Sequence, residues 1–351
     1  MKLNLSTFSS KNLMNNKILK IVTFIILMAV IGSIIGYVFE MMHKKNIVEN
    51  YDLYAKWKRW DDYYRTDKNV DVLFLGSSHA YVSYDPEIFD RKLSINSFNF
   101  GTPSQEPNMG YYILKEVIKK NKPRLLVYDI FWTKLQNEIT IGQVLSNYEF
   151  IKSPDVRNEI YKNLFSTLDK VEYTFPAIRY RLDFSSYMNR IVNKVLKIPY
   201  MNFEFEYKSK GYVFSEKVVD SETLNHSTQF ISNKYTGFNA KQIEYLDKTL
   251  QLCERNNIKV IFVTSPVPPS ILYSIKNEYG KIHADVEKIA DKYNIEYIDF
   301  NIENENKKIV TDSNFGDDNH LNLSGAKIVS DYLSDYILEN QLIDKEKNRI
   351  Y

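Results

Sequence analysis

Short apolar runs of strand length alternate with helical patterns in two parts of the chain. The strand-like runs are 72–75, 95–100, 124–129, 259–264 and 295–300, and helical periodicity covers 111–120, 241–256 and 282–293. This alternation predicts parallel pairing with helices on both faces of one sheet. Ligand sites in such sheets lie beyond the carboxyl ends of the strands. The sequence therefore predicts an α/β domain with its site at that edge.

Small and polar residues follow three of these predicted strands. Gly76-Ser77-Ser78-His79 follows the first strand, Gly101 follows the second, and Ser265-Pro266 follows a later one. Since all three lie at carboxyl ends, their loops converge on one edge of the sheet. This edge is the predicted place for chemistry.

Residues 134–242 interrupt the alternation. This section is rich in Tyr, Phe, Asn, Arg and Lys, with helical patterns near 156–170 and 187–196. We interpret it as an insertion that covers the strand ends. Arg179, Arg181, Lys210, Gly211 and Tyr212 are candidates for contacts with a polar polymer, and solvated surface with local ion pairs is the alternative.

An uncharged run precedes the α/β domain. Residues 21–39 carry no charge, and 19 helical residues span about 28 Å, close to the hydrocarbon thickness of a bilayer. We predict a cytoplasmic tail at 1–20, a transmembrane anchor at 21–42, a juxtamembrane helix at 43–69 and the α/β domain at 70–340. A cleaved signal peptide is the alternative, but the run is long and bulky residues follow it.

The charges beside the anchor do not decide its orientation, because lysines lie on both sides of it. We expect the N-terminus inside and the domain outside the cytoplasm, the usual layout of a short leader before a large domain. Tyr51, Tyr54, Trp57, Trp60 and Tyr64 then form one helical stripe. This stripe either lies at the membrane surface or packs onto the domain, and packing is the more usual role.

Composition excludes several classes of function. The net charge is +2, with 46 Lys and Arg against 44 Asp and Glu, so we expect no nucleic-acid partner. The single cysteine, Cys253, excludes an intrachain disulfide and a cysteine-based zinc site, and its helical context indicates a buried side chain. We expect no metal and no cofactor, since no His-Glu-x-x-His or comparable set occurs.

A serine, a histidine and an acid occur in positions suited to nucleophilic catalysis. A serine hydroxyl needs a base to take its proton, and the base needs an acid to fix its tautomer. Ser78 follows a strand, and Asp317 precedes His320 by three residues in a Gly-Asp-Asp-Asn loop. Ser77 is the alternative nucleophile. Taken singly, a helix-capping serine and an ordinary turn explain these motifs as well.

The two ends of the domain resemble the SGNH/GDSL hydrolase superfamily. Leu73-Phe74-Leu75-Gly76-Ser77-Ser78 resembles its first block, with Ser77 where Asp is usual. Asn99-Phe100-Gly101 resembles the second block, and Asp317-Asp318-Asn319-His320 resembles the last, Asp-x-x-His. The resemblance implies a flavodoxin-like three-layer α/β/α fold and acyl-ester chemistry.

The resemblance also implies roles for particular residues. Ser78 would be the nucleophile, His320 the base and Asp317 the acid, and the Ser78 and Gly101 amides would hold the oxyanion. Weaker candidates for substrate contacts are His79, Asn99, Arg179 and Tyr212.

One block of the superfamily has no counterpart. The strand at 124–129 continues into Ile130-Phe131-Trp132-Thr133 and lacks the Gly-x-Asn-Asp that supplies an oxyanion donor. Losing such a donor costs about 100-fold to 1000-fold in rate. With an anchor and Gly-Ser-Ser-His, the chain looks more like the branch of teichoic acid D-alanyl transfer proteins and alginate O-acetylation proteins.

Resemblance to that branch implies a membrane-anchored, extracytoplasmic acyltransferase. Its expected partners are an acylated donor, a cell-surface polysaccharide or teichoic-type acceptor, and a membrane-bound O-acyltransferase. The alternatives are a carbohydrate esterase or deacetylase with the same triad, and a non-catalytic polymer-binding partner of a membrane O-acyltransferase.

Overall fold

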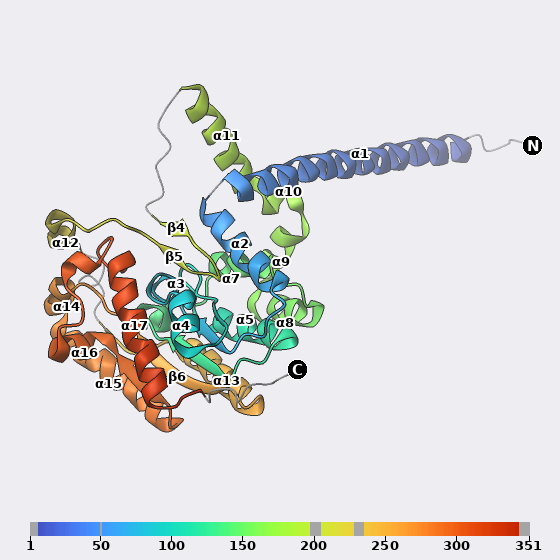
Figure 1. Cartoon of the computed structure of the whole chain (residues 1–351). Helices are drawn as coiled ribbons and strands as arrows, with labels where there is room; N and C mark the ends of the chain where they lie inside the picture. Colours follow the sequence, from blue (N-terminus) through green and yellow to red (C-terminus); the bar gives the residue numbers. More distant parts are fainter. Residues whose placement is uncertain (1–5, 50, 197–204, 228–234, 344–351) are drawn as a thin grey trace, which may run out of the picture. The chain divides into compact units, whose positions relative to one another are not determined.

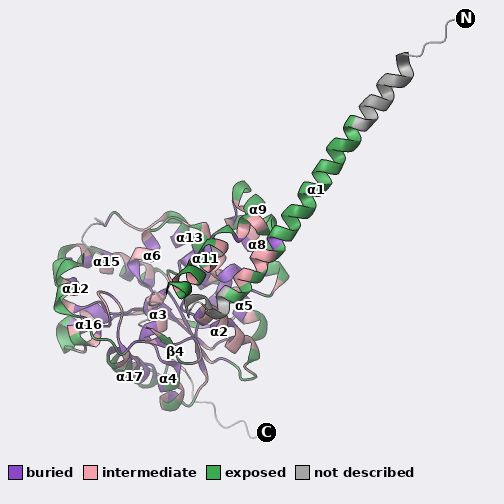
Figure 2. Cartoon of the chain, turned by 90° about the horizontal axis from the view of Figure 1, so that it is seen from above, coloured by how far each residue is buried: buried purple, intermediate pink, exposed green. Residues whose placement is uncertain are grey.

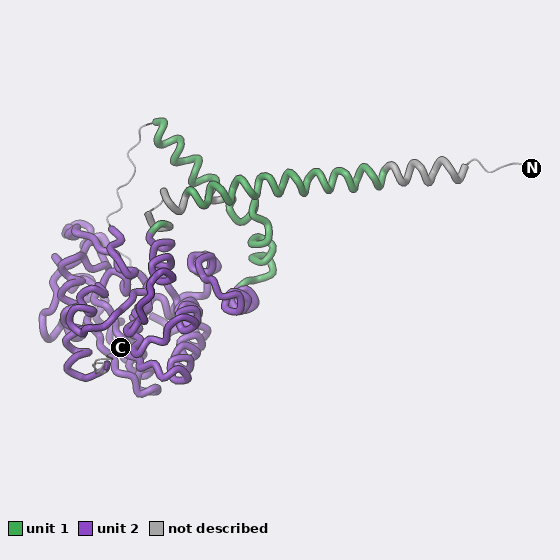
Figure 3. The backbone as a smooth tube through the Cα atoms, turned by 45° about the vertical axis from the view of Figure 1, so that its right-hand side comes forward, with its two compact units in different colours: residues 1–54, 165–201 green, residues 55–164, 202–351 purple. Residues whose placement is uncertain are grey.

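The computed structural model describes residues 6–49, 51–196, 205–227 and 235–343. The chain forms two compact units (Figure 3). The first unit comprises residues 1–54 and 165–201, and the second unit comprises 55–164 and 202–351. The first five residues of the predicted cytoplasmic tail lie outside the described residues.

A five-stranded parallel sheet forms the centre of the second unit (Figure 1). Its order is β2-β1-β3-β6-β7, and every neighbouring pair is parallel. This is the flavodoxin-like order of a doubly wound sheet, so the predicted fold class is confirmed. The strands are β1 (Val72–Leu75), β2 (Ser97–Asn99), β3 (Leu125–Asp129), β6 (Lys259–Thr264) and β7 (Glu296–Asp299).

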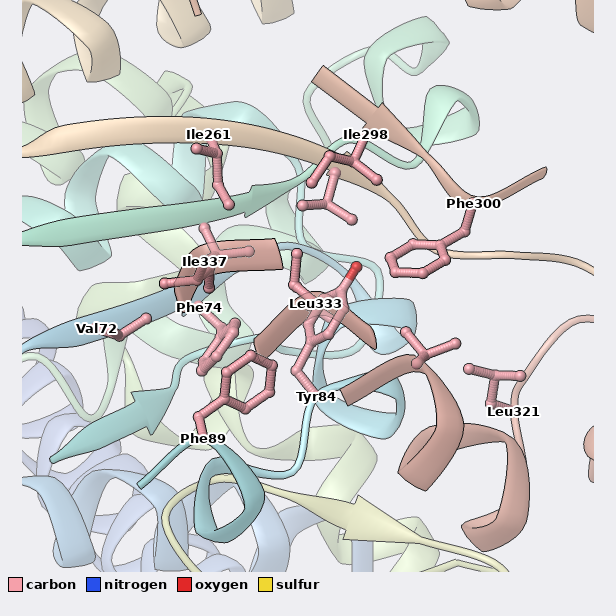
Figure 4. Close-up of a cluster of buried hydrophobic side chains, with 14 of the residues drawn as sticks. Val72, Phe74, Tyr84, Phe89, Ile261, Ile298, Phe300, Leu321, Leu333 and Ile337 are labelled. Carbon is pink, nitrogen blue, oxygen red and sulfur yellow. The ribbon is translucent and has the colours of Figure 1, made fainter. Parts of the chain in front are cut away.

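Helices cover both faces of this sheet. α5 (Pro107–Lys120) packs against α13 (Ala240–Arg255), and α4 (Pro86–Leu93) packs against α17 (Leu323–Glu339). Alternate residues of each strand point to opposite faces. Val72 and Phe74 of β1 therefore join Leu333 and Ile337 of α17 in one buried cluster (Figure 4). Burial of this cluster fixes the sheet against α17, which follows the loop of His320.

Shorter elements surround these layers. After β1 comes α3 (Ser78–Ser83), and after β7 come α16 (Phe300–Lys307) and a 3-10 turn (Asp312–Asn314). The insertion contributes α6 (Trp132–Gln136), α7 (Ile141–Tyr148), α8 (Pro154–Leu164), α12 (Ser221–His226) and a hairpin of β4 (Glu206–Tyr207) and β5 (Val213–Phe214). α14 (Pro269–Ser274) and α15 (Lys276–Lys292) lie between β6 and β7 in the chain.

The helix expected near 156–170 is two helices. α8 ends at Leu164 and α9 (Thr167–Thr174) begins three residues later. Ser166 accepts a hydrogen bond from the Asp169 amide, and Asp169 accepts one from the Ser166 amide. This reciprocal cap satisfies donors that a continuous helix would use internally, so a new helix starts here.

The aromatic helix α2 (Tyr51–Arg65) turns Trp60 of its stripe into the protein, while Tyr54, Trp57 and Tyr64 are half-buried. The Trp60 ring lies 4.7 Å from that of Phe100, just after β2, and the buried Tyr63, beside the stripe, lies 4.9 Å from the same ring. This is the arrangement that core packing predicts. Aromatic pairs at such distances stabilise beyond the area they bury.

The first unit contains the N-terminal helix α1 (Ser6–Glu49) with α9, α10 (Pro176–Arg179) and α11 (Arg181–Val195). The segment Lys17–Lys45 of α1 contains an 18-residue stretch with a mean hydropathy of 2.7 and is long and apolar enough to cross a membrane. Figure 2 shows most of this segment exposed. A membrane anchor and a signal sequence both have this character.

Candidate active site

Ser78 stands at the junction of β1 and α3. Ser77 is the N-cap of α3, so Ser78 is its first residue. Ser77 and His79 are buried at 1% and 3% exposure, whereas Ser78 is only partly buried. The turn therefore presents one of the two serine side chains at the surface of the sheet's carboxyl edge.

The structure brings Ser78, His320 and Asp317 into one hydrogen-bonded chain. Ser78 Oγ lies 2.7 Å from His320 Nε2, and His320 Nδ1 lies 2.8 Å from Asp317 Oδ2. Both separations are within the reach that proton transfer requires. Residues 242 positions apart in the sequence thus meet at the end of β1.

The loop that carries His320 is closed by its own hydrogen bonds. The Gly316 amide donates to the His320 carbonyl at 2.9 Å, and Phe315 and Leu321 form an antiparallel bridge. Asn322 ends the loop as the N-cap of α17, with its side chain accepting from the Gly325 amide. The helix and the bridge together position the histidine and the acid.

Asp317 is held in its ionised form. Burial raises the pKa of this carboxyl, but hydrogen bonds from the His320 ring and from the Asn319 and His320 amides outweigh it, so the pKa is lowered. An ionised Asp317 can only accept at His320 Nδ1. The proton of a neutral ring therefore sits on Nδ1, and Nε2 can accept from Ser78.

Ser77 faces a different histidine. Its hydroxyl lies 3.3 Å from His79 Nδ1, and the His79 ring stacks on Phe131 with centroids 3.4 Å apart. Burial holds the pKa of His79 well below its usual range, and the electrostatic influence of His320 and Lys134 acts in the same direction. His79 is thus a neutral ring beside His320, with centroids 4.9 Å apart.

The two expected oxyanion donors differ in whether their amides already have a hydrogen-bond acceptor. The Ser78 amide, at the first residue of α3, has no acceptor carbonyl within its own helix. The Gly101 amide donates instead to Asn99 Oδ1 at 2.9 Å. For Gly101 to bind an oxyanion, the incoming oxygen must replace the Asn99 side chain.

Both the oxygen and the nitrogen of the Asn99 side-chain amide form hydrogen bonds with the backbone. Its Nδ2 donates to the carbonyls of Ala80 and Tyr84 at 2.8 Å and 3.0 Å, and its side chain is fully buried. Every polar atom of this side chain thus has a backbone partner. Asn99 links α3 to the end of β2 in the described conformation.

Two other candidates lie in the insertion. Tyr212 is buried in the hairpin, where its ring stacks with that of Phe214 at 6.4 Å. Arg179 belongs to the first unit, where its guanidinium lies 3.7 Å from the Tyr173 ring centroid. Direct substrate contacts by these two residues stay a prediction.

Phe205 is a site residue that the sequence reasoning missed. Its ring packs edge-on against His320, with centroids 5.8 Å apart, just before β4. Phe205 and Tyr207 alternate with Glu204 and Glu206, a strand signal that could have indicated this hairpin. Together with Phe131 behind His79, Phe205 gives the site an aromatic wall.

Among the residues that the structure describes, no group of three or more His, Cys, Asp or Glu side chains is placed to hold a metal ion. The arrangement of Ser78, His320 and Asp317 supports activation of a serine hydroxyl by an imidazole that an acid orients.

Comparison with known proteins gives one family and several low-identity structures. A proposed acylhydrolase from Bacteroides fragilis NCTC 9343 aligns at 11% identity and a TM-score of 0.40, over 82% of this chain and 96% of its own. A GDSL-like lipase from Bacteroides thetaiotaomicron VPI-5482 aligns at 12% identity and a TM-score of 0.39, over 82% of this chain and 98% of its own. No curated protein matches the chain.

The family model described as "Protein of unknown function (DUF1574)" matches residues 25–331, which include most of the apolar segment Lys17–Lys45, Ser78 and His320. The match covers most of the chain. The chain belongs to the DUF1574 family.

Proposed function

We propose that this protein is a membrane-anchored serine acyltransferase of the SGNH type, which O-acylates a cell-surface polysaccharide or teichoic-type polymer. One observation carries the proposal. Ser78 Oγ, His320 and Asp317 form an unbroken chain of hydrogen bonds of 2.7 Å and 2.8 Å. This chain supports a serine activated for attack on an acyl group.

In the proposed first half-reaction, Ser78 Oγ bonds to the acyl carbon of the donor and its proton passes to His320 Nε2. The ionised Asp317 stabilises the imidazolium through Nδ1. The Ser78 amide, with Gly101 once Asn99 withdraws, binds the oxyanion. When the donor's leaving group departs, it takes the proton from Nε2 and leaves acyl-Ser78.

In the second half-reaction, a hydroxyl of the polymer attacks acyl-Ser78 and gives its proton to Nε2. Ser78 recovers that proton as the new ester leaves. Phe205 and Phe131 favour transfer over hydrolysis, because apolar side chains beside His320 and His79 limit the water that competes with the acceptor. Hydrolysis of a carbohydrate ester by the same residues is the second candidate.

The proposed setting is the outer face of the cell membrane. Lys17–Lys45 would anchor the chain by one pass, with the α/β domain outside the cytoplasm. A membrane-bound O-acyltransferase would supply the acylated donor. Support for this setting comes from the apolar helix and from the sequence resemblance.

An active-site probe tests the proposal. Full-length protein in detergent is treated with a fluorophosphonate, which labels activated serines. The proposal expects labelling of the native chain, no labelling of Ser78→Ala, and retained labelling of Ser77→Ala. If the native, folded chain is not labelled, the protein is a non-catalytic partner rather than an enzyme.

Product analysis then separates transfer from hydrolysis. An activated acetyl ester is incubated with the protein, with and without a polysaccharide or teichoic acceptor. Ester formed on the acceptor, and absent with Ser78→Ala, supports transfer. Free acetate alone, at the same rate with and without acceptor, contradicts transfer and leaves the esterase.

A further inference from the structure

Two helices of the insertion, α10 and α11, pack onto the C-terminal part of the apolar helix α1, and α9 packs against α10. A Cβ on Gly36 would lie 3.1 Å from Pro176 Cβ and 3.2 Å from the Ala177 amide, so this glycine allows α10 to approach closely. Phe39 stacks on Phe184 at 4.8 Å, one turn further along α1. These contacts lie within the first unit.

These contacts lie at the C-terminal end of the uncharged run of α1. Gly36 lies inside the uncharged run 21–39, three residues before its end, which corresponds to about 4.5 Å along the helix axis. His43, which stacks on Tyr180 at 4.6 Å, lies just beyond the run. If α1 crosses a bilayer, α10 and the start of α11 therefore lie where hydrocarbon gives way to headgroups.

α11 carries an apolar stripe that faces solvent in the structure. Met188, Ile191, Val192 and Val195 follow the i, i+3, i+4, i+7 spacing and are exposed by 40%, 41%, 47% and 73%. Phe184, which packs on α1, lies on the same side one turn earlier. The stripe is thus a continuation of the surface that contacts the anchor.

The rest of the exposed surface of α11 is polar. Ser186 and Lys194 are exposed and Asn193 is half-buried, all away from the stripe, whereas the guanidinium of Arg190 is buried. Nearby in the first unit, Leu168 and Phe175 are also exposed, by 77% and 54%. An amphipathic helix with an exposed lysine on its polar side is suited to the surface of an anionic bilayer.

α11 is inclined to α1. Figures 1 and 3 show α11 crossing α1 obliquely, not running alongside it. Its apolar stripe therefore leaves α1 near the level where the apolar run ends, where it can meet the surface of a bilayer.

We infer that α9, α10 and α11 form an interfacial element that lies in the headgroup region, with the stripe of Met188, Ile191, Val192 and Val195 in contact with lipid. The inference rests on the membrane anchor of the proposed function. It adds a second attachment, which uses the insertion and holds the anchor at a fixed depth.

Lipid quenching of fluorescent labels tests the inference on the full-length chain. The background is Cys253→Ser, since Cys253 is the chain's one cysteine and is buried. Single cysteines are introduced as Val192→Cys and Val195→Cys on the stripe, and as Ser186→Cys and Asn193→Cys on the polar side. Each is labelled with an environment-sensitive dye and reconstituted in phosphatidylethanolamine and phosphatidylglycerol vesicles that contain a spin-labelled lipid.

The expected result is quenching at least several-fold stronger at residues 192 and 195 than at 186 and 193. Ile26→Cys, in the middle of α1, reports the anchor separately. Strong quenching at residue 26 with equal, weak quenching at all four α11 sites would overturn the inference and leave the anchor intact. Absence of quenching at residue 26 would overturn the anchor and the inference with it.

Discussion

Asp317 holds His320 by two separate hydrogen bonds. Its Oδ2 accepts from the ring at Nδ1, 2.8 Å away, and its Oδ1 accepts from the backbone amide of the same residue at 2.6 Å. The first bond sets the proton on Nδ1, and the second fixes the histidine's backbone relative to the acid. One carboxylate thus controls both the tautomer and the position of the base.

Replacement of Asp317 by asparagine should separate these two effects. Asp317→Asn keeps the side-chain shape, but the amide can donate to Nδ1 and so favours the wrong tautomer of His320. We expect the rate of ester cleavage to fall on the order of 1000-fold or more with little loss of fold. The measurement is kcat/KM for an activated ester, with unfolding followed in parallel.

Asp318 provides the matched control. Its side chain accepts from Ser227 Oγ at 2.6 Å and from Asn319 Nδ2 at 3.0 Å, not from the His320 ring. Asp318→Asn should therefore keep kcat/KM within a few-fold of the native value. Equal losses in the two variants would argue that the loop, and not a specific acid, is what activity requires.

His79 should make stability depend on pH. Its folded pKa lies well below the usual range, first because of burial and then because of the electrostatic influence of His320 and Lys134. Below about pH 6.5 the unfolded chain gains a proton on this ring that the folded chain does not bind. The free energy of unfolding should therefore fall as the pH falls through about 6.5, with a slope that approaches about 1.4 kcal/mol per pH unit below it.

Two uncharged substitutions test this linkage. His79→Gln and His79→Phe differ in packing on Phe131 but both lack the titrating group. Both should show a shallower loss of stability between pH 7 and pH 5.5 than the native chain, whatever their stability at pH 7. Urea unfolding can be followed by tryptophan fluorescence, since Trp57, Trp60 and Trp132 all belong to the second unit. A slope unchanged in both variants would contradict a neutral His79.

Asn99 should matter for stability more than for substrate binding. Its side chain donates to the Tyr84 carbonyl and accepts from the Gly101 amide, both buried. Asn99→Ala removes these partners, and each buried group left unpaired costs about 1 to 3 kcal/mol. We expect a loss of roughly 2 to 3 kcal/mol in the free energy of unfolding.

The exposed Asn306 is the control for Asn99. Asn306→Ala should change the free energy of unfolding by less than about 0.5 kcal/mol. If Asn99→Ala instead raises KM while stability stays native, the side chain contacts substrate, and its backbone bonds are incidental to the fold.

The parts of the fold that were predictable are those that local pattern determines. β1 and β6 occupy the predicted residues, because each is an apolar run that ends in small or polar residues. β2 is shorter than the predicted 95–100, as only three residues pair with β1. Local pattern does not determine the strand order β2-β1-β3-β6-β7, which depends on long-range pairing between strands.

The catalytic residue types of the site could be predicted from the sequence, but the aromatic residues that surround them could not. Ser78 and the Asp317 loop lie at carboxyl ends of strands or beside them, where topology brings distant segments together. The alternation of Phe205 and Tyr207 with Glu206 indicates a strand, but β4 and β5 have only two residues each, so local pattern does not say where the hairpin lies. Its place depends on long-range contacts, so Phe205 beside His320 could not be read from periodicity.

Gly211, in the turn between β4 and β5, lies directly against the end of β2. Gly211 has a φ of +86°, and a Cβ there would lie 1.7 Å from the carbonyl oxygen of Asn99. Its own carbonyl accepts from Arg59 Nη2 at 3.0 Å, and the preceding carbonyl of Lys210 accepts from the Asn99 amide at 2.9 Å. The turn is thus fitted onto the end of β2, and no side chain larger than hydrogen fits at this position.

Gly237→Ala is the control that separates steric overlap from backbone strain. Its φ is +103°, but a Cβ there would meet nothing within 4 Å. Alanine at either position bears the left-handed conformation, at about 1 to 2 kcal/mol, and only Gly211→Ala adds an overlap with the backbone. We expect Gly211→Ala to lose at least about 2 kcal/mol more in the free energy of unfolding than Gly237→Ala. Since the same hairpin holds Phe205 beside His320, Gly211→Ala should also slow fluorophosphonate labelling of Ser78 at temperatures where it stays folded. Equal stability and equal labelling in the two variants would show that the hairpin does not depend on this contact with β2.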